Sequence, residues 1–283
     1  MHSNQLTKNI SFEFFPPQTT EHLDKLLETA QKLNSRSPAF FSVTYGAGGS
    51  TQERSLNTIQ GLLTAKLTEV APHISCIGST KEKISELLAH YKSQGIRRLV
   101  ALRGDLPSGL GTNTGHFRHA QELVAFIREN SQDHFHIEVA AYPECHPEAS
   151  SMQVDLKHFK EKVTAGADSA ITQYFYNVEA YEQFLNNCLK LNINIPIIPG
   201  IMPITNYTQL ARFSDNCGAE IPRWIRKHLE DYGDNLDAIK DFGIEVITKL
   251  CEKLVTLGAP GLHFYTLNKA DSSLAVLANL NLI

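Results

Sequence analysis

The sequence lacks the long runs that mark membrane or nucleic-acid-binding proteins. Its apolar stretches are short and broken by proline, as in Ile195-Pro196-Ile197-Ile198-Pro199, so none can form a transmembrane helix. Lys and Arg are scattered and the net charge is -4, which argues against nucleic acid as a partner. Residues 1–9 are polar and lack a signal-peptide core. We therefore expect a cytoplasmic protein in which residues 1–9 form a flexible extension.

The cysteines and glycines of the chain also lack the spacings that are typical of zinc sites, disulfide frameworks and phosphate-binding loops. The five cysteines are far apart, odd in number and include no Cys-x-x-Cys pair, which excludes a zinc finger and a disulfide framework. The loops Gly46-Ala47-Gly48-Gly49 and Gly109-Leu110-Gly111 have neither the G-x-G-x-x-G spacing nor a phosphate-binding P-loop pattern. A dinucleotide, if one binds, is therefore not held in the Rossmann manner.

What the sequence does contain is one alternation, repeated from end to end, of a short β-rich segment and a longer helical one. The 283 residues are 42% hydrophobic and 20% charged, as in an ordinary globular protein. The predicted strands are Ile10–Phe15, Phe40–Tyr45, His73–Ile77, Arg98–Leu102, Ile137–Tyr142, Ala170–Phe175, Ile195–Pro199 and Leu262–Leu267. Eight such units predict an α/β fold, a (β/α)₈ TIM-type barrel forming a single domain over residues 1–283. A doubly wound open sheet is the alternative.

Helix signals fill the gaps between these strands. Ser79-Thr80-Lys81-Glu82 is typical of a capping box, and Gly95 ends the helix that follows it. The gap before the last strand is the longest, and it predicts two helices, Tyr207–Asn216 and Pro222–Glu230, before a long apolar stripe that ends at Gly258.

Glu13 is the most informative single residue. It lies among aromatic residues in Ser11-Phe12-Glu13-Phe14-Phe15-Pro16-Pro17, where prolines stop a strand. Apolar surroundings favour the neutral form of a carboxyl group, and a neutral carboxyl can donate a proton near neutral pH. The alternative is a solvated carboxylate at a strand end.

Other polar residues also fall at predicted strand ends, which in a barrel converge on the active-site face. They are Thr44 and Tyr45, Arg103 to Asp105, Tyr142 to His146, Gln173, and Tyr265 to Lys269, with His73 near the start of its strand. This convergence predicts a site. Glu13, His73, Asp105 and His146 could form a metal centre, but none of them has a compact ligand spacing, so we predict no metal. Cys145 and His146 are adjacent and point to opposite sides of an extended segment, which argues against a thiol nucleophile.

Motifs spread over almost the whole chain resemble those of the bacterial-type methylenetetrahydrofolate reductases. They are Ser11 to Pro17, Val43 to Ala47, Ala71 to His73, Leu102 to Asp105, Ala140 to Glu144, His146 to Ala149, Ile171 to Gln173, and His263 to Asn268. The resemblance implies a barrel that binds FAD non-covalently and reduces 5,10-methylenetetrahydrofolate to 5-methyltetrahydrofolate with NADH, in a ping-pong reaction that supplies methionine synthesis. It also implies a homo-oligomer, a tetramer or a dimer.

The resemblance further implies roles for individual residues. Glu13 matches the general acid that opens the methylene bridge of the folate to an iminium, and Asp105 the carboxylate between flavin and pterin, where it stabilises that cation. Thr44 matches an NADH contact. The matched cofactor-binding positions, for FAD or NADH, are Thr44, Tyr45, Ala47, His73, Arg103, Gly104, Asp105, Ala120, Tyr142, His146, Ala149, Asp155, His158, Glu161 and Lys162. The matched substrate-binding positions are Asp105, Gln173, Gln209, Phe213, Tyr265 and Lys269.

Two positions depart from the family pattern. Lys269 replaces an arginine, which keeps the charge but loses the bidentate fork for a substrate carboxylate. Glu161 replaces a basic residue beside Lys162, and an acidic side chain does not suit a phosphate. The rival readings are another barrel flavoprotein, such as a proline dehydrogenase-like oxidase, a metal-dependent barrel lyase, and a non-catalytic flavin or folate carrier.

Overall fold

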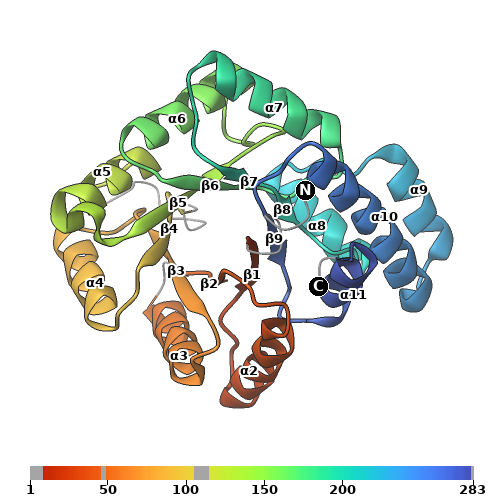
Figure 1. The fold of residues 1–283 in the computed structure, drawn as a ribbon, viewed down its shortest axis with the longest axis horizontal. Coiled ribbons are helices and arrows are strands. Elements are labelled where there is room, and N and C mark those ends of the chain that lie inside the picture. Colours follow the sequence, from red (N-terminus) through yellow and green to blue (C-terminus); the bar gives the residue numbers. More distant parts are fainter. Residues whose placement is uncertain (1–8, 46–48, 105–114, 282–283) are drawn as a thin grey trace.

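The computed structural model describes residues 9–45, 49–104 and 115–281, in which parallel strands alternate with helices (Figure 1). The strands are β1 (Ile10–Phe14), β2 (Phe40–Val43), β3 (Glu69–Ser75), β4 (Arg98–Leu102), β5 (His136–Ala141), β6 (Ser169–Thr172), β7 (Ile197–Ile198), β8 (Gly200–Ile201) and β9 (Leu262–Tyr265). The helices are α2 (Thr20–Asn34), α3 (Gly49–Ala65), α4 (Lys81–Ser93), α5 (Ala120–Ser131), the 3₁₀ helix η1 (Gln132–His134), α6 (Met152–Thr164), α7 (Val178–Lys190), α8 (Tyr207–Cys217), α9 (Arg223–Tyr232), α10 (Leu236–Thr256) and α11 (Asp271–Asn279).

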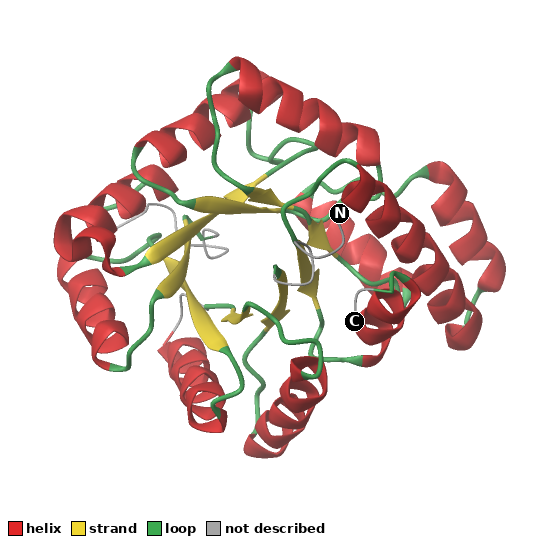
Figure 2. Ribbon diagram, in the orientation of Figure 1, coloured by secondary structure: helices red, strands yellow, loops and turns green. Residues whose placement is uncertain are grey.

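The sheet runs in the order β7-β6-β5-β4-β3-β2-β1-β9-β8, with every pair parallel. β7 and β8 are consecutive parts of one strand interrupted at Pro199. β7 pairs with β6 and β8 pairs with β9, so this one strand closes the ring. Figure 2 shows the ring of strands surrounded by helices. The predicted (β/α)₈ barrel is confirmed and the open-sheet alternative is excluded.

Gly200 allows a tight contact at this closure. A Cβ atom at Gly200 would lie 2.2 Å from the Thr172 carbonyl oxygen and 2.6 Å from Cε2 of Tyr265. Because that Cβ is absent, the Tyr265 hydroxyl reaches past Gly200 and donates a hydrogen bond to the Thr172 carbonyl oxygen at 2.7 Å. The Gly200 N–H donates to Thr172 Oγ1 at 2.9 Å. The closing strand thus fixes the position of Tyr265 at the end of β9.

Side chains alternate along each strand between the helices and the barrel interior. Phe12, Phe14 and Phe41 are fully buried in the large apolar core that includes the inner faces of the helices. The barrel interior holds a much smaller apolar cluster, formed by Phe40, Ala71, Val100 and Ile171. Polar side chains occupy the interior on both sides of this cluster, and those at the carboxyl ends of the strands form the site described below.

Several sequence predictions on element bounds need correction, and one helix was not predicted at all. β3 begins at Glu69, so His73 lies near its carboxyl end and not near its start. The strand predicted to end at Pro199 continues to Ile201. Thr80, not Ser79, caps α4, because its side chain accepts the Lys83 N–H. The terminal helix α11 had no predicted counterpart. Within the described part of the chain, no helix is long and apolar enough to span a membrane.

Candidate active site

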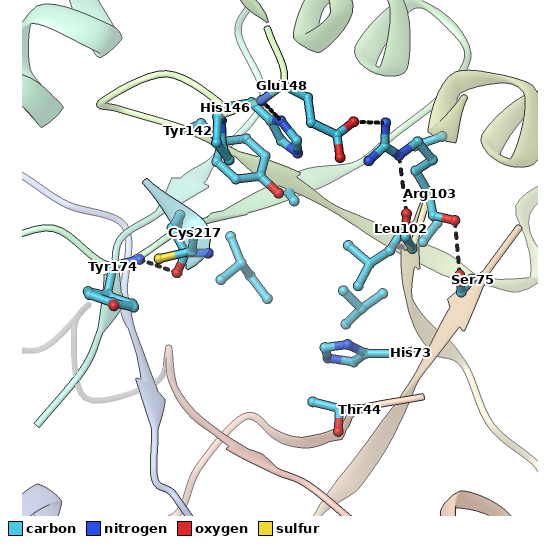
Figure 3. A pocket seen from close by; sticks show the side chains of 18 of the residues that line it. Thr44, His73, Ser75, Leu102, Arg103, Tyr142, His146, Glu148, Tyr174 and Cys217 are labelled. Carbon is cyan, nitrogen blue, oxygen red and sulfur yellow. Dashed lines mark hydrogen bonds and ion pairs between the residues drawn. The ribbon is translucent and has the colours of Figure 1, made fainter. Parts of the chain in front are cut away.

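A cavity of about 950 Å³, called here the mouth cavity, lies at the carboxyl ends of the strands and among the loops that follow them. This volume is at the upper end of the range for small-molecule sites. Figure 3 shows side chains from several strands and loops around its open centre. The residues predicted for the site that line it are Glu13, Thr44, Tyr45, His73, Arg103, Gly104, Ala120, Tyr142, His146, Ala149, Asp155, His158, Lys162, Gln173, Phe213 and Tyr265.

Of the predicted site residues that the structure describes, three do not line the mouth cavity, and two more predicted residues fall outside the described ranges. Ala47 and Asp105 lie outside the described residues. Glu161 pairs instead with His158, whose Nδ1 lies 3.1 Å from Glu161 Oε2. Gln209 is half-buried on α8, and Lys269 is exposed beyond β9. The ligand roles of Glu161, Gln209 and Lys269 therefore remain predictions without support from the cavity.

The mouth cavity also contains residues to which sequence reasoning gave no role. They include Ser75, His119, Glu148, Tyr174 and Cys217. Tyr174 is instructive, because strand alternation would direct it away from its neighbour Gln173. β6 ends at Thr172, however, so the alternation no longer applies there. Only the position of these residues next to predicted site residues could have signalled them.

Glu13 lies against two imidazoles. Its Oε2 is 3.1 Å from Nε2 of His73 and 3.5 Å from Nε2 of His263, and Ser42 Oγ also lies at 3.5 Å. The order of the parallel strands explains this meeting, because β1 pairs with β9, which carries His263, and with β2, whose other neighbour β3 carries His73. Both Nε2 atoms are buried and neither is well aligned for a hydrogen bond. We therefore describe the contacts as short charge contacts, a geometry that often tightens when a ligand binds.

This environment corrects the expectation that Glu13 lies in apolar surroundings and holds a proton by itself. Burial does raise the pKa of Glu13, but the charge contacts with His73 and His263 outweigh it and lower the pKa to about 2. Only 17% of the side chain is exposed, so these two neighbours decide its charge. In the structure Glu13 is a carboxylate, and a proton on this cluster belongs to the group as a whole.

Lys162 supplies a buried positive charge to another part of the mouth cavity. Its Nζ donates to the Ala140 carbonyl oxygen at 2.5 Å, and no described carboxylate lies within ion-pair distance of it. Desolvation lowers the pKa of Lys162 to about 8, although Asp155 opposes the shift. An ammonium group with donors to spare, facing a cavity, suits an anionic ligand.

Arg103 and His146 build the neighbouring wall. Arg103 Nη1 lies 2.6 Å from Glu148 Oε2, and Arg103 Nε donates to the Gly104 carbonyl oxygen (Figure 3). The His146 N–H donates to Asp155, which ties the loop after β5 to the start of α6. Gly104 has φ of +84°, and a Cβ there would lie 1.9 Å from Ser75 Oγ. Only glycine therefore allows backbone to approach the cavity at this point.

A closed barrel with a large cavity at the carboxyl ends of its strands, lined by several titratable groups, defines an enzyme of the (β/α)₈ class. The methylenetetrahydrofolate reductase family model matches residues 1–281. The chain belongs to this family and is a 5,10-methylenetetrahydrofolate reductase.

Individual relatives agree with this assignment. The chain is 40% identical over 272 residues to 5,10-methylenetetrahydrofolate reductase of Escherichia coli, covering 96% of this chain and 90% of that protein. It is also 40% identical over 285 residues to methylenetetrahydrofolate reductase (NADH) 1 of Arabidopsis thaliana, where it covers 48% of the longer protein.

The barrel fold also has counterparts among solved structures. An uncharacterized protein from Clostridium thermocellum that binds two copies of 5-methyl-5,6,7,8-tetrahydrofolic acid matches with a TM-score of 0.65 at 18% identity, over 99% of this chain and 96% of that one. A dihydropteroate synthase from Xanthomonas albilineans matches with a TM-score of 0.52 at 10% identity, over 97% of this chain and 93% of that one.

Proposed function

We propose that this reductase binds FAD in the mouth cavity and uses NADH to reduce it, and that Glu13 delivers the proton which the folate requires. The family is flavin-dependent. The observation that carries the proposal is that one cavity of about 950 Å³ contains both a buried cation, Lys162, and the Glu13 cluster. A dinucleotide needs the first, and opening of the folate ring needs the second.

The donors in the mouth cavity fit a diphosphate. Lys162 provides the buried ammonium, and Arg103 provides a guanidinium that now pairs with the half-exposed Glu148. The first turn of α5, at Ala120, also lines the cavity, and N–H groups at a helix N-terminus favour a phosphate. Backbone can approach the ligand at Gly104. When bound, FAD would accept a hydride from NADH and pass one to the folate.

The side chains of this chain would then control the folate. Protonation of folate N10 releases the C–N10 bond and leaves an iminium at N5, and Glu13 is the acid within reach of the cavity. Gln173 and Tyr265 line the same cavity, and Phe213 offers a ring on which a pterin can stack. Asp105 keeps its predicted role near the cation, at a position outside the described residues.

NADH and the folate would use the same face of the site in turn. Thr44, which is expected to contact NADH, and Gln173, which is expected to bind the folate, line the same cavity as Glu13. Shared use of one face gives a ping-pong reaction, in which double-reciprocal plots at several NADH concentrations are parallel. Intersecting lines would count against it. The oligomeric state, a tetramer or a dimer, remains a prediction.

The Glu13→Gln variant tests the proposal. Flavin reduction by NADH should survive, while reduction of 5,10-methylenetetrahydrofolate should fall by roughly two to four powers of ten, as is usual when general acid catalysis is lost. The two half-reactions are measured separately by stopped-flow absorbance of the flavin, and the visible spectrum of the purified variant confirms that FAD is bound. If both half-reactions fell together, Glu13 would be a structural residue. A colourless wild-type protein would sink the flavin assignment.

A further inference from the structure

The turn after β9 contains a leucine in a conformation that leucine rarely adopts. Thr266 and Lys269 close the turn, with the Lys269 N–H donating to the Thr266 carbonyl oxygen at 3.0 Å. The two central residues, Leu267 and Asn268, have φ of +51° and +58°. Positive φ at both central positions is the pattern of a type I′ turn, which favours glycine, asparagine or aspartate there. Asn268 suits its position, whereas the backbone of Leu267 is strained.

The strained residue is also one that reaches the mouth cavity. The Leu267 side chain lines this cavity, together with Thr266, with Glu13 on β1 and with Phe15 just after β1. Backbone strain persists only where the surrounding structure enforces it, and such positions gather at functional sites. The contacts that hold this turn therefore bear on how the cavity binds its ligand.

Asn268 holds the turn with its side-chain amide. Its Oδ1 accepts the Phe15 N–H at 3.1 Å, and its Nδ2 donates to the Phe15 carbonyl oxygen at 2.8 Å. An amide offers the same donor and acceptor as a backbone peptide group. The backbone pairing of β9 with β1 ends at Tyr265. The Asn268 side chain thus continues the pairing along the β1 chain while the backbone after β9 turns away.

Thr266 ties the same turn to the backbone of Glu13. Its Oγ1 donates to the Glu13 carbonyl oxygen at 2.6 Å and accepts the Asn268 N–H at 3.1 Å. The Thr266 N–H also donates to the Glu13 carbonyl oxygen, at 3.3 Å. The turn is therefore fixed to the β1 chain at Glu13 and again at Phe15, so the place of Leu267 relative to Glu13 is fixed as well.

We propose that Asn268 is a positioning residue for folate binding, which holds the strained turn so that Leu267 packs against a planar ring of the folate. This proposal rests on the part of the proposed function that places the folate in the mouth cavity beside Glu13. A leucine that the turn already orders loses little conformational freedom when the ligand binds. Loss of the Asn268 amide would free the turn to relax and would move Leu267 away from the ligand.

The affinity for 5-methyltetrahydrofolate, measured by isothermal titration calorimetry with the holoenzyme, tests the proposal without turnover. Asn268→Ala removes the amide and should weaken binding roughly tenfold, as expected when one leucine side chain loses part of its apolar contact. Leu267→Ala should weaken binding to the same extent. The double variant should bind no more weakly than either single variant, because both changes remove the same contact. Losses that add would overturn the proposal.

Asn268→Gly separates the position of the turn from the stability of the fold. Glycine adopts positive φ without strain, so this variant should be more stable than Asn268→Ala in thermal unfolding. Both variants lack the amide, so both should bind 5-methyltetrahydrofolate equally weakly. A role confined to stability predicts instead that affinity recovers together with stability in the glycine variant, and that recovery would overturn the proposal.

Asn9→Ala is the matched control. Asn9 precedes β1 at the amino end of the barrel, where its Nδ2 donates to the Pro260 carbonyl oxygen at 2.7 Å. It therefore makes the same kind of amide-to-backbone bond between the β1 and β9 segments, at the opposite end from the mouth cavity. Its loss should leave the affinity for 5-methyltetrahydrofolate unchanged. A fall equal to that of Asn268→Ala would show that affinity reports general damage to the β1–β9 pair and would overturn the proposal.

Failure of this inference and failure of the proposed function give different results. If Glu13→Gln is defective in folate reduction but the Asn268 variants bind 5-methyltetrahydrofolate normally, this inference fails and the proposed function stands. If Glu13→Gln reduces folate normally while Asn268→Ala and Leu267→Ala show the same weakened binding, the proposed proton donor is wrong and the role of Asn268 stands.

Discussion

Lys162→Met should stabilise the FAD-free barrel and weaken its binding of FAD. Burial lowers the pKa of Lys162 from 10.5 to about 8, a difference equivalent to about 3 kcal/mol of unfavourable free energy in the charged folded state. Methionine has a similar length and removes that cost. It also removes the hydrogen bond to the Ala140 carbonyl oxygen, which is worth about 1 kcal/mol. The net expectation at pH 7 is a gain of about 2 kcal/mol in the free energy of unfolding.

The pH dependence follows from the sign of the shift. The pKa of Lys162 is lower in the folded than in the unfolded chain, so its destabilising effect is complete below pH 8 and fades between pH 8 and 10.5. The advantage of the Met variant should fade over the same range. FAD affinity should behave in the opposite sense, because a diphosphate needs the ammonium. In the wild type we expect affinity to weaken as pH rises above 8, and in Lys162→Met to be low throughout.

Thermal unfolding of the FAD-free protein and fluorescence titration with FAD measure the two effects. Lys160→Met is the matched control, because it removes the same charge from an exposed position on the same helix. It should change neither quantity. A loss of stability in Lys162→Met would refute the view that burial of the Lys162 ammonium destabilises the FAD-free fold. An unchanged affinity for FAD would refute the view that this ammonium binds an anionic ligand.

Two further substitutions test the barrel that positions the site. Gly200→Ala should destabilise the fold by about 3 kcal/mol or more in chemical denaturation, because its Cβ would meet the Thr172 carbonyl oxygen and the Tyr265 ring; wild-type stability would contradict the closure described here. Arg98→Met should cost about 3–5 kcal/mol by leaving Glu138 buried without its guanidinium partner at 2.5 Å. Adding Glu138→Gln should recover part of that loss, and strict additivity of the two changes would argue against the pair.

Much of the fold could be predicted from the sequence because the alternation of strands and helices is local. The bounds of β4 were predicted without error, since an apolar run between a helix stop and a polar loop leaves little choice. The closing strand was harder. Pro199 suggested an end, but the strand continues because β7 and β8 pair with different neighbours and the interruption falls where the partner changes. That change of pairing partner depends on closure of the ring of strands, which no local sequence pattern can indicate.

The sequence predicted many of the side chains that line the mouth cavity but not the electrostatics around Glu13. Strand ends and family motifs identified Glu13, but the sequence around it is aromatic and suggested apolar surroundings. Phe12 and Phe14 in fact face the helices, while Glu13 faces the interior. Its charge is decided by His73 and His263, which are distant in sequence and reach it only through the parallel register.

The two ends of the barrel each bury a glutamate, and they differ in the side chains that neutralise its charge. Each end contains a serine, a histidine and a glutamate in contact. Burial raises the pKa of both glutamates, but their partners outweigh burial, so the net pKa is lowered in both cases. At the amino end, Glu138 also pairs with Arg98, whose guanidinium does not release a proton in proteins. That end therefore keeps a fixed charge and serves stability. At the carboxyl end the described nitrogen atoms that contact Glu13 belong to the imidazoles of His73 and His263. This difference in partners, an arginine at one end and histidines at the other, is consistent with a structural role for Glu138 and with the role proposed above for Glu13.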